Sequence, residues 1–154
     1  MKIDWLFKPF HELTPEQLYA ILKLRVDTFM IEQKCFYEEL DGEDQASFHL
    51  MGFCNGQLGL YARIFPPGHN YHGRACPEAR IGRIATHKSL RGKGLGHALI
   101  KEAVGEIEKR FGNVTSIMDA QSHLEKFYNT HGFVKDGAEY LEDDIPHIPM
   151  KRQA

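Results

Sequence analysis

Residues 91–96, with the sequence Arg-Gly-Lys-Gly-Leu-Gly, place three glycines and two cations directly before an amphipathic segment. Glycine allows backbone conformations in which several successive amides face one anion. The first N–H groups of a helix have no acceptor within that helix and carry partial positive charge. A turn of this composition at a helix start therefore predicts a phosphate or pyrophosphate site.

Two common phosphate loops do not match this turn. A P-loop needs Gly-Lys-Ser/Thr, and neither Gly92 nor Gly94 is followed in that way. A dinucleotide fingerprint needs a third glycine in the sixth position, where this chain has His97 or Leu99. A nucleotide hydrolase is therefore disfavoured.

The turn lies between two regular elements. The run before it contains Ile81, Ile84 and Thr86 between charged residues, which predicts a central strand. After the turn, apolar residues recur every four positions and predict one buried helix face: Leu95, Leu99, Ala103, Ile107 and Phe111.

Arg91-x-x-Gly94-x-Gly96 resembles the acyl-coenzyme A loop of the GNAT N-acetyltransferases, Arg/Gln-x-x-Gly-x-Gly/Ala. Lys88 stands where a proline is common in the preceding linker. Residues 127–133 look like the late helix of the family, which carries a tyrosine and ends in Gly-Phe. Shorter stretches resemble the ElaA branch, namely residues 31–33, 120–124 and 145–148.

The resemblance implies one α+β domain over residues 1–154, with a central, mostly antiparallel, twisted sheet of about six to seven strands and about four flanking helices. The local patterns agree with a mixed fold. They predict a first strand over residues 3–10, a helix capped by Thr14 and Gln17 that runs to Glu32, a hairpin over 49–55 and 58–65, a strand over 114–120, a helix with a Ser122–Glu125 capping box, and strands over 133–141 and 147–151.

Composition argues against several other classes. The net charge of −2 gives no case for nucleic-acid binding, and no apolar run approaches the length of a membrane span. The three cysteines are odd in number and irregularly spaced, which suits reduced thiols. We therefore expect a cytoplasmic protein without nucleic-acid or membrane partners.

The resemblance also assigns a site. The turn residues Arg91, Gly92, Lys93, Gly94, Leu95 and Gly96 would bind the pyrophosphate of acetyl-CoA, and the backbone of Ile84, Ala85 and Thr86 would hold its pantetheine arm. Gln121 stands where many members have an asparagine that touches the cofactor. Tyr128 matches the usual general acid, although without the family a tyrosine there is more often a packing residue.

The implied reaction is direct transfer of an acetyl group from acetyl-CoA to a primary amine, of a small molecule or a peptide, in a ternary complex and without a metal. The general base stays open among Glu32, His87, His123, His147 and a water relay. A non-catalytic acyl-CoA sensor or partner-binding domain is the alternative. The oligomeric state, including a homodimer, is not determined by the sequence.

Three groups of polar residues have two interpretations each. Arg25 and Glu32, seven residues apart, face either a substrate cleft or solvent; with His147 they are candidate acceptor contacts. The acidic run at residues 38–44 is either hydrated surface or, with the acidic residues at 139–144, an attractor for a cationic amine. In the exposed loop at residues 66–78, His69, His72 and Cys76 are either metal ligands or ordinary loop polarity.

Overall fold

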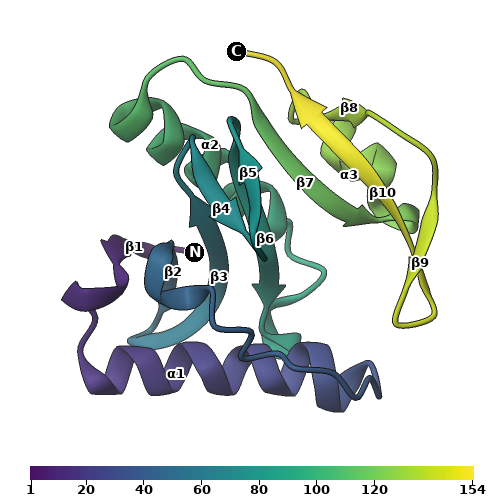
Figure 1. Cartoon of the computed structure of the whole chain (residues 1–154). Helices are drawn as coiled ribbons and strands as arrows, with labels where there is room; N and C mark the ends of the chain where they lie inside the picture. The colour runs from purple at the N-terminus through teal and green to yellow at the C-terminus, as the bar shows by residue number, and fades with distance from the viewer.

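The computed structural model describes residues 1–154 as one mixed sheet with helices on both faces (Figure 1). The sheet has eight strands in the order β1-β2-β3-β6-β7-β10-β8, and β9 also pairs with β10. Only β6 and β7 are parallel; every other neighbouring pair is antiparallel. The strands are β1 (Asp4–Pro9), β2 (Phe48–Cys54), β3 (Gln57–Phe65), β6 (Ala79–Thr86), β7 (Ser116–Gln121), β8 (Val134–Lys135), β9 (Tyr140–Glu142) and β10 (Ile145–Arg152).

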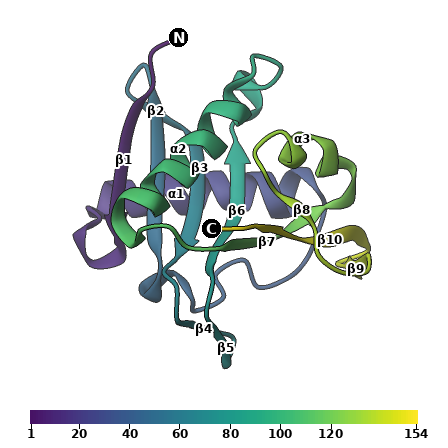
Figure 2. The same cartoon turned by 90° about the horizontal axis from the view of Figure 1, so that it is seen from above.

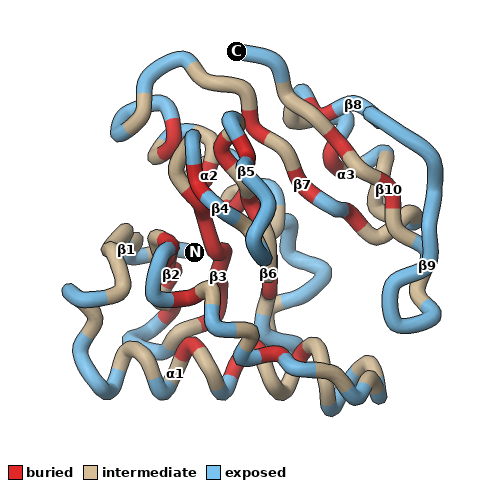
Figure 3. The backbone as a smooth tube through the Cα atoms, viewed as in Figure 1, coloured by how far each residue is buried: buried red, intermediate tan, exposed pale blue.

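The two long helices cover opposite faces of this sheet, as Figure 2 shows. Helix α1 (Pro15–Arg25) starts with the capping box of Thr14 and Gln17 that the sequence predicts. It buries Ile21 and Leu24 against one face, while α2 (Leu95–Phe111) buries its apolar residues in a larger cluster on the other face. Helix α3 (Glu125–Asn129) adds Tyr128 to that larger cluster. Strand β3, largely red in Figure 3, contributes buried residues to both clusters. No helix combines the length and apolar character that a membrane crossing needs.

Strands β6 and β7 separate soon after they begin, which opens the middle of the sheet (Figure 1). Their pairing is limited to Ala79 with Ser116 and Arg80 with Ile117. Beyond this point β6 stays on β3 and β7 stays on β10. A register shift between β3 and β6 coincides with Arg83, whose φ of +52° is unusual for a residue other than glycine. The bulge therefore lies at the mouth of the opening.

The fold class is confirmed, and four local expectations are wrong. The α1 segment changes at Val26–Glu32 into a π-helix, so the seven-residue spacing of Arg25 and Glu32 does not place them on one face. The loop at residues 66–78 contains a small hairpin, β4 (His69–Tyr71) and β5 (Arg74–Cys76).

The other two differences lie near the C-terminus. Ser122 makes no capping hydrogen bond, because residues Ser122–Leu124 form a separate 3₁₀ turn before α3. The strand expected over residues 133–141 is divided into β8 and β9. Pro149 on β10 has no N–H to donate to a neighbouring strand, and its ring lies against Gly137 in the interruption.

Candidate active site at the opening of the sheet

The glycine turn has the geometry of an anion site. Gly92 and Gly94 have φ values of +77° and +75°, a region that other residues adopt only with strain. Gly94 is the N-cap of α2, and the amides of residues 92–96 have no backbone or side-chain acceptor in the protein. Gly96 has a different role, because a Cβ atom there would lie 3.4 Å from the ring of Phe127. The turn thus presents successive free N–H groups and lets α3 pack against the start of α2.

The two cations of the turn differ in their availability. The guanidinium of Arg91 forms a two-pronged ion pair with Glu32 at the end of the π-helix, and its Nε donates to the carbonyl oxygen of Thr86 at 3.0 Å. The hydrogen bond from Arg91 lowers the pKa of Glu32, which stays ionised at neutral pH. Lys93 is exposed and has no acidic partner. Lys93 therefore places a positive charge beside the amides that no carboxylate neutralises.

Residues Ile84, Ala85 and Thr86 form the β6 edge of the opening. On one side Ala85 and Thr86 pair with Tyr61 and Leu60 of β3. On the other side no strand follows, because the pairing with β7 has already ended. This edge leads directly to the turn through residues Lys88–Leu90, so an extended ligand arm and its phosphate could contact one continuous piece of chain.

Tyr128 is buried with 5 % of its surface exposed. Its ring packs edge-on against Phe127 at a centroid distance of 5.0 Å, and it belongs to the cluster against which Ile84 also packs. Burial raises the pKa of Tyr128 to about 12, so its hydroxyl keeps its proton at neutral pH. The hydroxyl therefore carries a proton at neutral pH and is not a base there.

On the side of the opening away from β6, Gln121 and His147 face each other in the pairing of β7 with β10. The His147 ring stacks on Tyr140 at 5.9 Å, and its Nδ1 lies 2.7 Å from the carbonyl oxygen of Ile145. Burial and the nearby Asp119 raise the pKa of Tyr140. The structure therefore brings His147 to the same region as Gln121, with only 13 % of its side chain exposed.

The other three candidate bases lie on other segments of the chain. His87 is exposed and uses Nδ1 to accept the backbone N–H of Ser89 at 3.2 Å. His123 is exposed in the turn before α3. Glu32 is engaged by Arg91. His87 and Glu32 therefore lie near the Thr86 end of the β6 edge, His87 as the next residue and Glu32 through Arg91.

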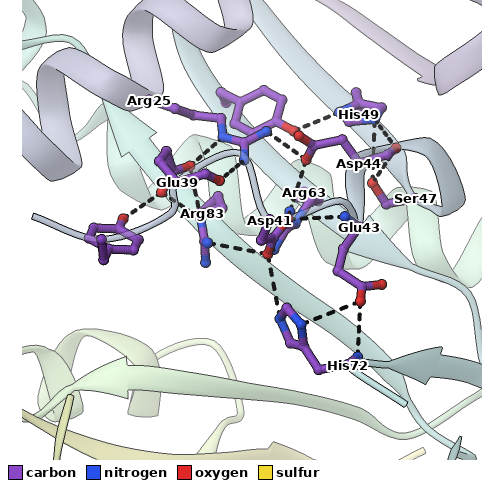
Figure 4. A network of polar contacts seen from close by, with 12 residues as sticks. Arg25, Glu39, Asp41, Glu43, Asp44, Ser47, His49, Arg63, His72 and Arg83 are labelled. Carbon is purple, nitrogen blue, oxygen red and sulfur yellow. Dashed lines mark hydrogen bonds and ion pairs between the residues drawn. The ribbon is translucent and has the colours of Figure 1, made fainter. Parts of the chain in front are cut away.

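The suggestion that Arg25 touches substrate is wrong, because its side chain is entirely buried. Figure 4 shows that it points toward carboxylates of the same molecule. Its Nε lies 2.6 Å from the Glu39 carboxylate, and its Nη1 lies 2.7 Å from Asp44. Arg25 therefore belongs to an internal ion-pair cluster.

Neither interpretation of the acidic run at residues 38–44 fits its three central carboxylates. Glu39, Asp41 and Asp44 are almost completely covered, and each is paired with one or more arginines. Burial opposes the ionisation of Asp41, but hydrogen bonds and attraction from Arg63 outweigh it and hold its pKa at about 2. These carboxylates are neither hydrated nor available to attract an amine.

This cluster was not predicted from the sequence; its members are Arg25, Glu39, Asp41, Asp44, Arg63 and Arg83. A signal was present, because Arg63 interrupts an otherwise apolar strand and needs a partner when buried. The residues weighed as metal ligands do not surround a common centre. His69 stacks on Phe65, His72 approaches Asp41 and Glu43, and no group of three metal-binding side chains is found.

One cavity lies on the α1 side of the sheet. It has a volume of about 600 Å³ and is bounded by α1, the turn between β2 and β3, and residues near His87 and Leu90. It includes neither Tyr128 nor the edge of β6 at residues 84–86. The opening stays the candidate site, because the β6 edge leads from it to the free amides and Ile84 on that edge packs against the cluster that contains Tyr128.

Residues 11–154 match the acetyltransferase (GNAT) domain family, and the chain belongs to this family. It is 36 % identical to the UPF0039 protein sll0451 of Synechocystis over 151 residues, which cover 97 % of this chain and 95 % of that protein. An acyl-CoA N-acyltransferase structure from Pseudomonas aeruginosa superposes with a TM-score of 0.89 at 39 % identity, covering 98 % of this chain and 99 % of that one. The ElaA structure from Escherichia coli gives a TM-score of 0.89 at 33 % identity, covering 99 % of this chain and 100 % of that one. The expected ElaA-like relationship is confirmed.

Proposed function

We propose that the protein transfers an acetyl group from acetyl-CoA to a primary amine, by direct attack within a ternary complex. The observation that carries the proposal is the run of unpartnered amides at residues 92–96, placed at the end of the open β6 edge. Membership of the GNAT family and the similarity to an acyl-CoA N-acyltransferase support acyl transfer in general. What we propose beyond general acyl transfer is the acetyl group as the acyl group, the amine as the acceptor, and the roles of the individual residues.

The chain fits acetyl-CoA in two respects. The turn offers backbone N–H groups and the ammonium of Lys93 to the pyrophosphate, without a carboxylate partner on Lys93. The unpaired edge of Ile84, Ala85 and Thr86 offers backbone groups to the amides of the pantetheine arm. Acetyl-CoA supplies an acyl group already activated as a thioester.

The side chains then have separate roles. Backbone amides at the β6 edge would polarise the acyl carbonyl, and Tyr128 would give its proton to the departing thiolate. Gln121, at the end of β7, would contact the arm from the opposite side. His147 and Glu32 remain candidate bases for the incoming amine, with a water relay as the third route.

The acceptor is proposed to be a small-molecule or peptide amine. The hypothesis that residues 38–44 attract a cation loses its main support, because the central carboxylates are neutralised internally. The exposed Glu142, Asp143 and Asp144 still leave an acidic turn on the other side of the opening. A screen of cationic and neutral amines at two salt concentrations tests whether this acidic turn attracts a cationic acceptor, since attraction by exposed carboxylates weakens with added salt.

The alternative is an acyl-CoA sensor without catalysis. Buried Tyr128 favours an enzyme, since a sensor needs only the turn and the β6 edge. Steady-state assays with acetyl-CoA and an amine panel, beside direct binding measurements, separate the two. Binding without turnover on any amine would favour the sensor.

A further inference from the structure

The ion-pair cluster joins the loop after the π-helix to the bulge of β6 (Figure 4). Glu39 is its link, because the same carboxylate lies 2.6 Å from Nε of Arg25 and 2.9 Å from Nε of Arg83. Asp41 adds a longer contact of 3.4 Å to Arg83. The cluster therefore reaches from the end of α1 to the strand that borders the opening.

The backbone of Arg83 requires such support. A φ of +52° is unfavourable for an arginine, and strained residues persist only where the surrounding structure holds them. Glycine would adopt this conformation freely, so the presence of arginine indicates that the side chain is needed. Its guanidinium is held by Glu39 and also lies 5.8 Å from the ring centre of Tyr37, whose hydroxyl donates to Glu39.

Burial of these charges adds little by itself to the free energy of unfolding. Apolar residues of similar size often stabilise a protein as well as a buried ion pair does, whereas directional ion pairs fix geometry. Glu39 and Arg25 are fully covered, while 19 % of the Arg83 side chain is exposed at the edge of the cluster. The buried members thus hold one another in place. Arg83, which is part of β6, connects this strand to them.

We propose that Glu39 is a positioning residue for acyl transfer, which holds the Arg83 bulge and thereby sets the backbone of Ile84, Ala85 and Thr86 at the opening between β6 and β7. The proposal rests on the proposed function for its catalytic consequence. Its structural part, the link from Glu39 to the β6 backbone, can be tested without any substrate.

Asp44 provides a matched control within the same cluster. Like Glu39, it is a buried carboxylate that contacts Arg25, at 2.7 Å, but its second partner is Arg63 on β3 and it does not contact Arg83. Glu39→Gln and Asp44→Asn each remove one buried negative charge. Arg83→Gln removes the other end of the link while leaving the pair of Glu39 with Arg25 in place.

The first measurement is hydrogen exchange of the amides of residues 84–87, compared between variants at equal global stability. We expect exchange there to rise about ten-fold in Glu39→Gln and Arg83→Gln and to stay unchanged in Asp44→Asn. Equal increases in Asp44→Asn, or no increase in Arg83→Gln, would overturn the proposal. Arg83→Gln, at the exposed edge, keeps the test decisive if Glu39→Gln does not fold.

The second measurement is steady-state kinetics with acetyl-CoA and an accepted amine. Misplacement of the β6 edge should lower kcat about ten- to a hundred-fold in Glu39→Gln and Arg83→Gln and leave the KM of the amine unchanged. Asp44→Asn should keep its kcat when corrected for the folded fraction. A protein without turnover on any amine would count against the proposed function, while the exchange result would still decide the role of Glu39.

Discussion

The guanidinium of Arg91 and the carboxylate of Glu32 form a two-pronged ion pair, 2.9 Å between Nη2 and Oε1, that ties the anion turn to the π-helix. The arginine is the first residue of the turn, yet its charge is directed to a residue 59 positions earlier in the chain. A carboxylate thus lies near the place where the pyrophosphate would bind.

Replacement of Glu32 by glutamine should strengthen acetyl-CoA binding at low salt. The change removes a negative charge and frees Arg91; since both side chains are partly exposed, the gain should be about two- to five-fold. Titration calorimetry at low and high salt measures it, and the gain should shrink as salt rises. Weaker binding by Glu32→Gln would show instead that the ion pair is needed to shape the turn.

Replacement of Tyr128 by phenylalanine should lower kcat by about a hundred-fold or more while leaving the affinity for acetyl-CoA nearly unchanged. The ring and its packing against Phe127 are retained, and only the proton donor is lost. Rapid-mixing assays beside binding titrations separate the two quantities. Unaltered turnover would remove Tyr128 from the mechanism.

The same tyrosine should not limit activity on the alkaline side of neutrality. Its folded-state pKa is raised from 10 to about 12, so the protonated form stabilises the fold below pH 10 and this contribution is lost as pH rises toward 12. A decline in activity that begins near pH 8 must therefore come from another group. If Tyr128→Phe shows the same pH profile as the parent at a lower rate, the decline comes from a group other than the tyrosine.

Mild acid should destabilise the protein through His49. This buried histidine lies between the hydroxyl of Tyr61 and the carbonyl of Asp44, and burial lowers its pKa from 6.5 to about 4. Because the folded state disfavours the proton, the stability present above pH 6.5 is lost as pH falls toward 4, by up to about 3 kcal/mol. Urea unfolding of the parent and of His49→Gln across this range measures the difference in slope. Identical slopes would contradict the assignment.

Replacement of Gly59 by alanine should disturb the segment that leads into the turn. A Cβ there would lie 2.3 Å from Cδ1 of Leu90, so the leucine must move, at a cost of about 1 to 3 kcal/mol. Gly82→Ala is the control, since its Cβ would meet no atom within 4 Å. Thermal unfolding should distinguish the variants, and equal stabilities would show that Leu90 is free to rearrange.

The sequence predicts those parts of the fold that depend on near neighbours. The cap of Thr14 and Gln17, the glycine turn and the periodic face of α2 are each encoded within a few residues. The assignment of Ile84, Ala85 and Thr86 to the pantetheine arm came only from the family resemblance, and the separation of β6 from β7 was not predicted. No local pattern in either strand indicates that their pairing stops at Arg80 and Ile117.

The parts that could not be predicted depend on distant contacts. Arg83 meets Glu39 across 44 residues, and Arg63 meets Asp41 across 22. The acidic run has the composition of hydrated surface, and only the tertiary fold brings three arginines to it. The π-helix at Val26–Glu32 was also not predicted. It changes the side of the helix on which Glu32 lies relative to Arg25.

We propose that the amides at residues 92–96 bind the pyrophosphate of acetyl-CoA, and titration calorimetry of the parent beside Gly94→Asp tests this binding most directly. Aspartate tolerates the left-handed backbone of Gly94 better than most residues, so the variant mainly adds a negative charge at the site. Gly105→Asp, on the exposed side of α2, is the matched control. We expect the parent and Gly105→Asp to bind equally and Gly94→Asp to bind at least about ten-fold more weakly. Absence of binding by the parent, or equal binding by Gly94→Asp, would contradict the claim.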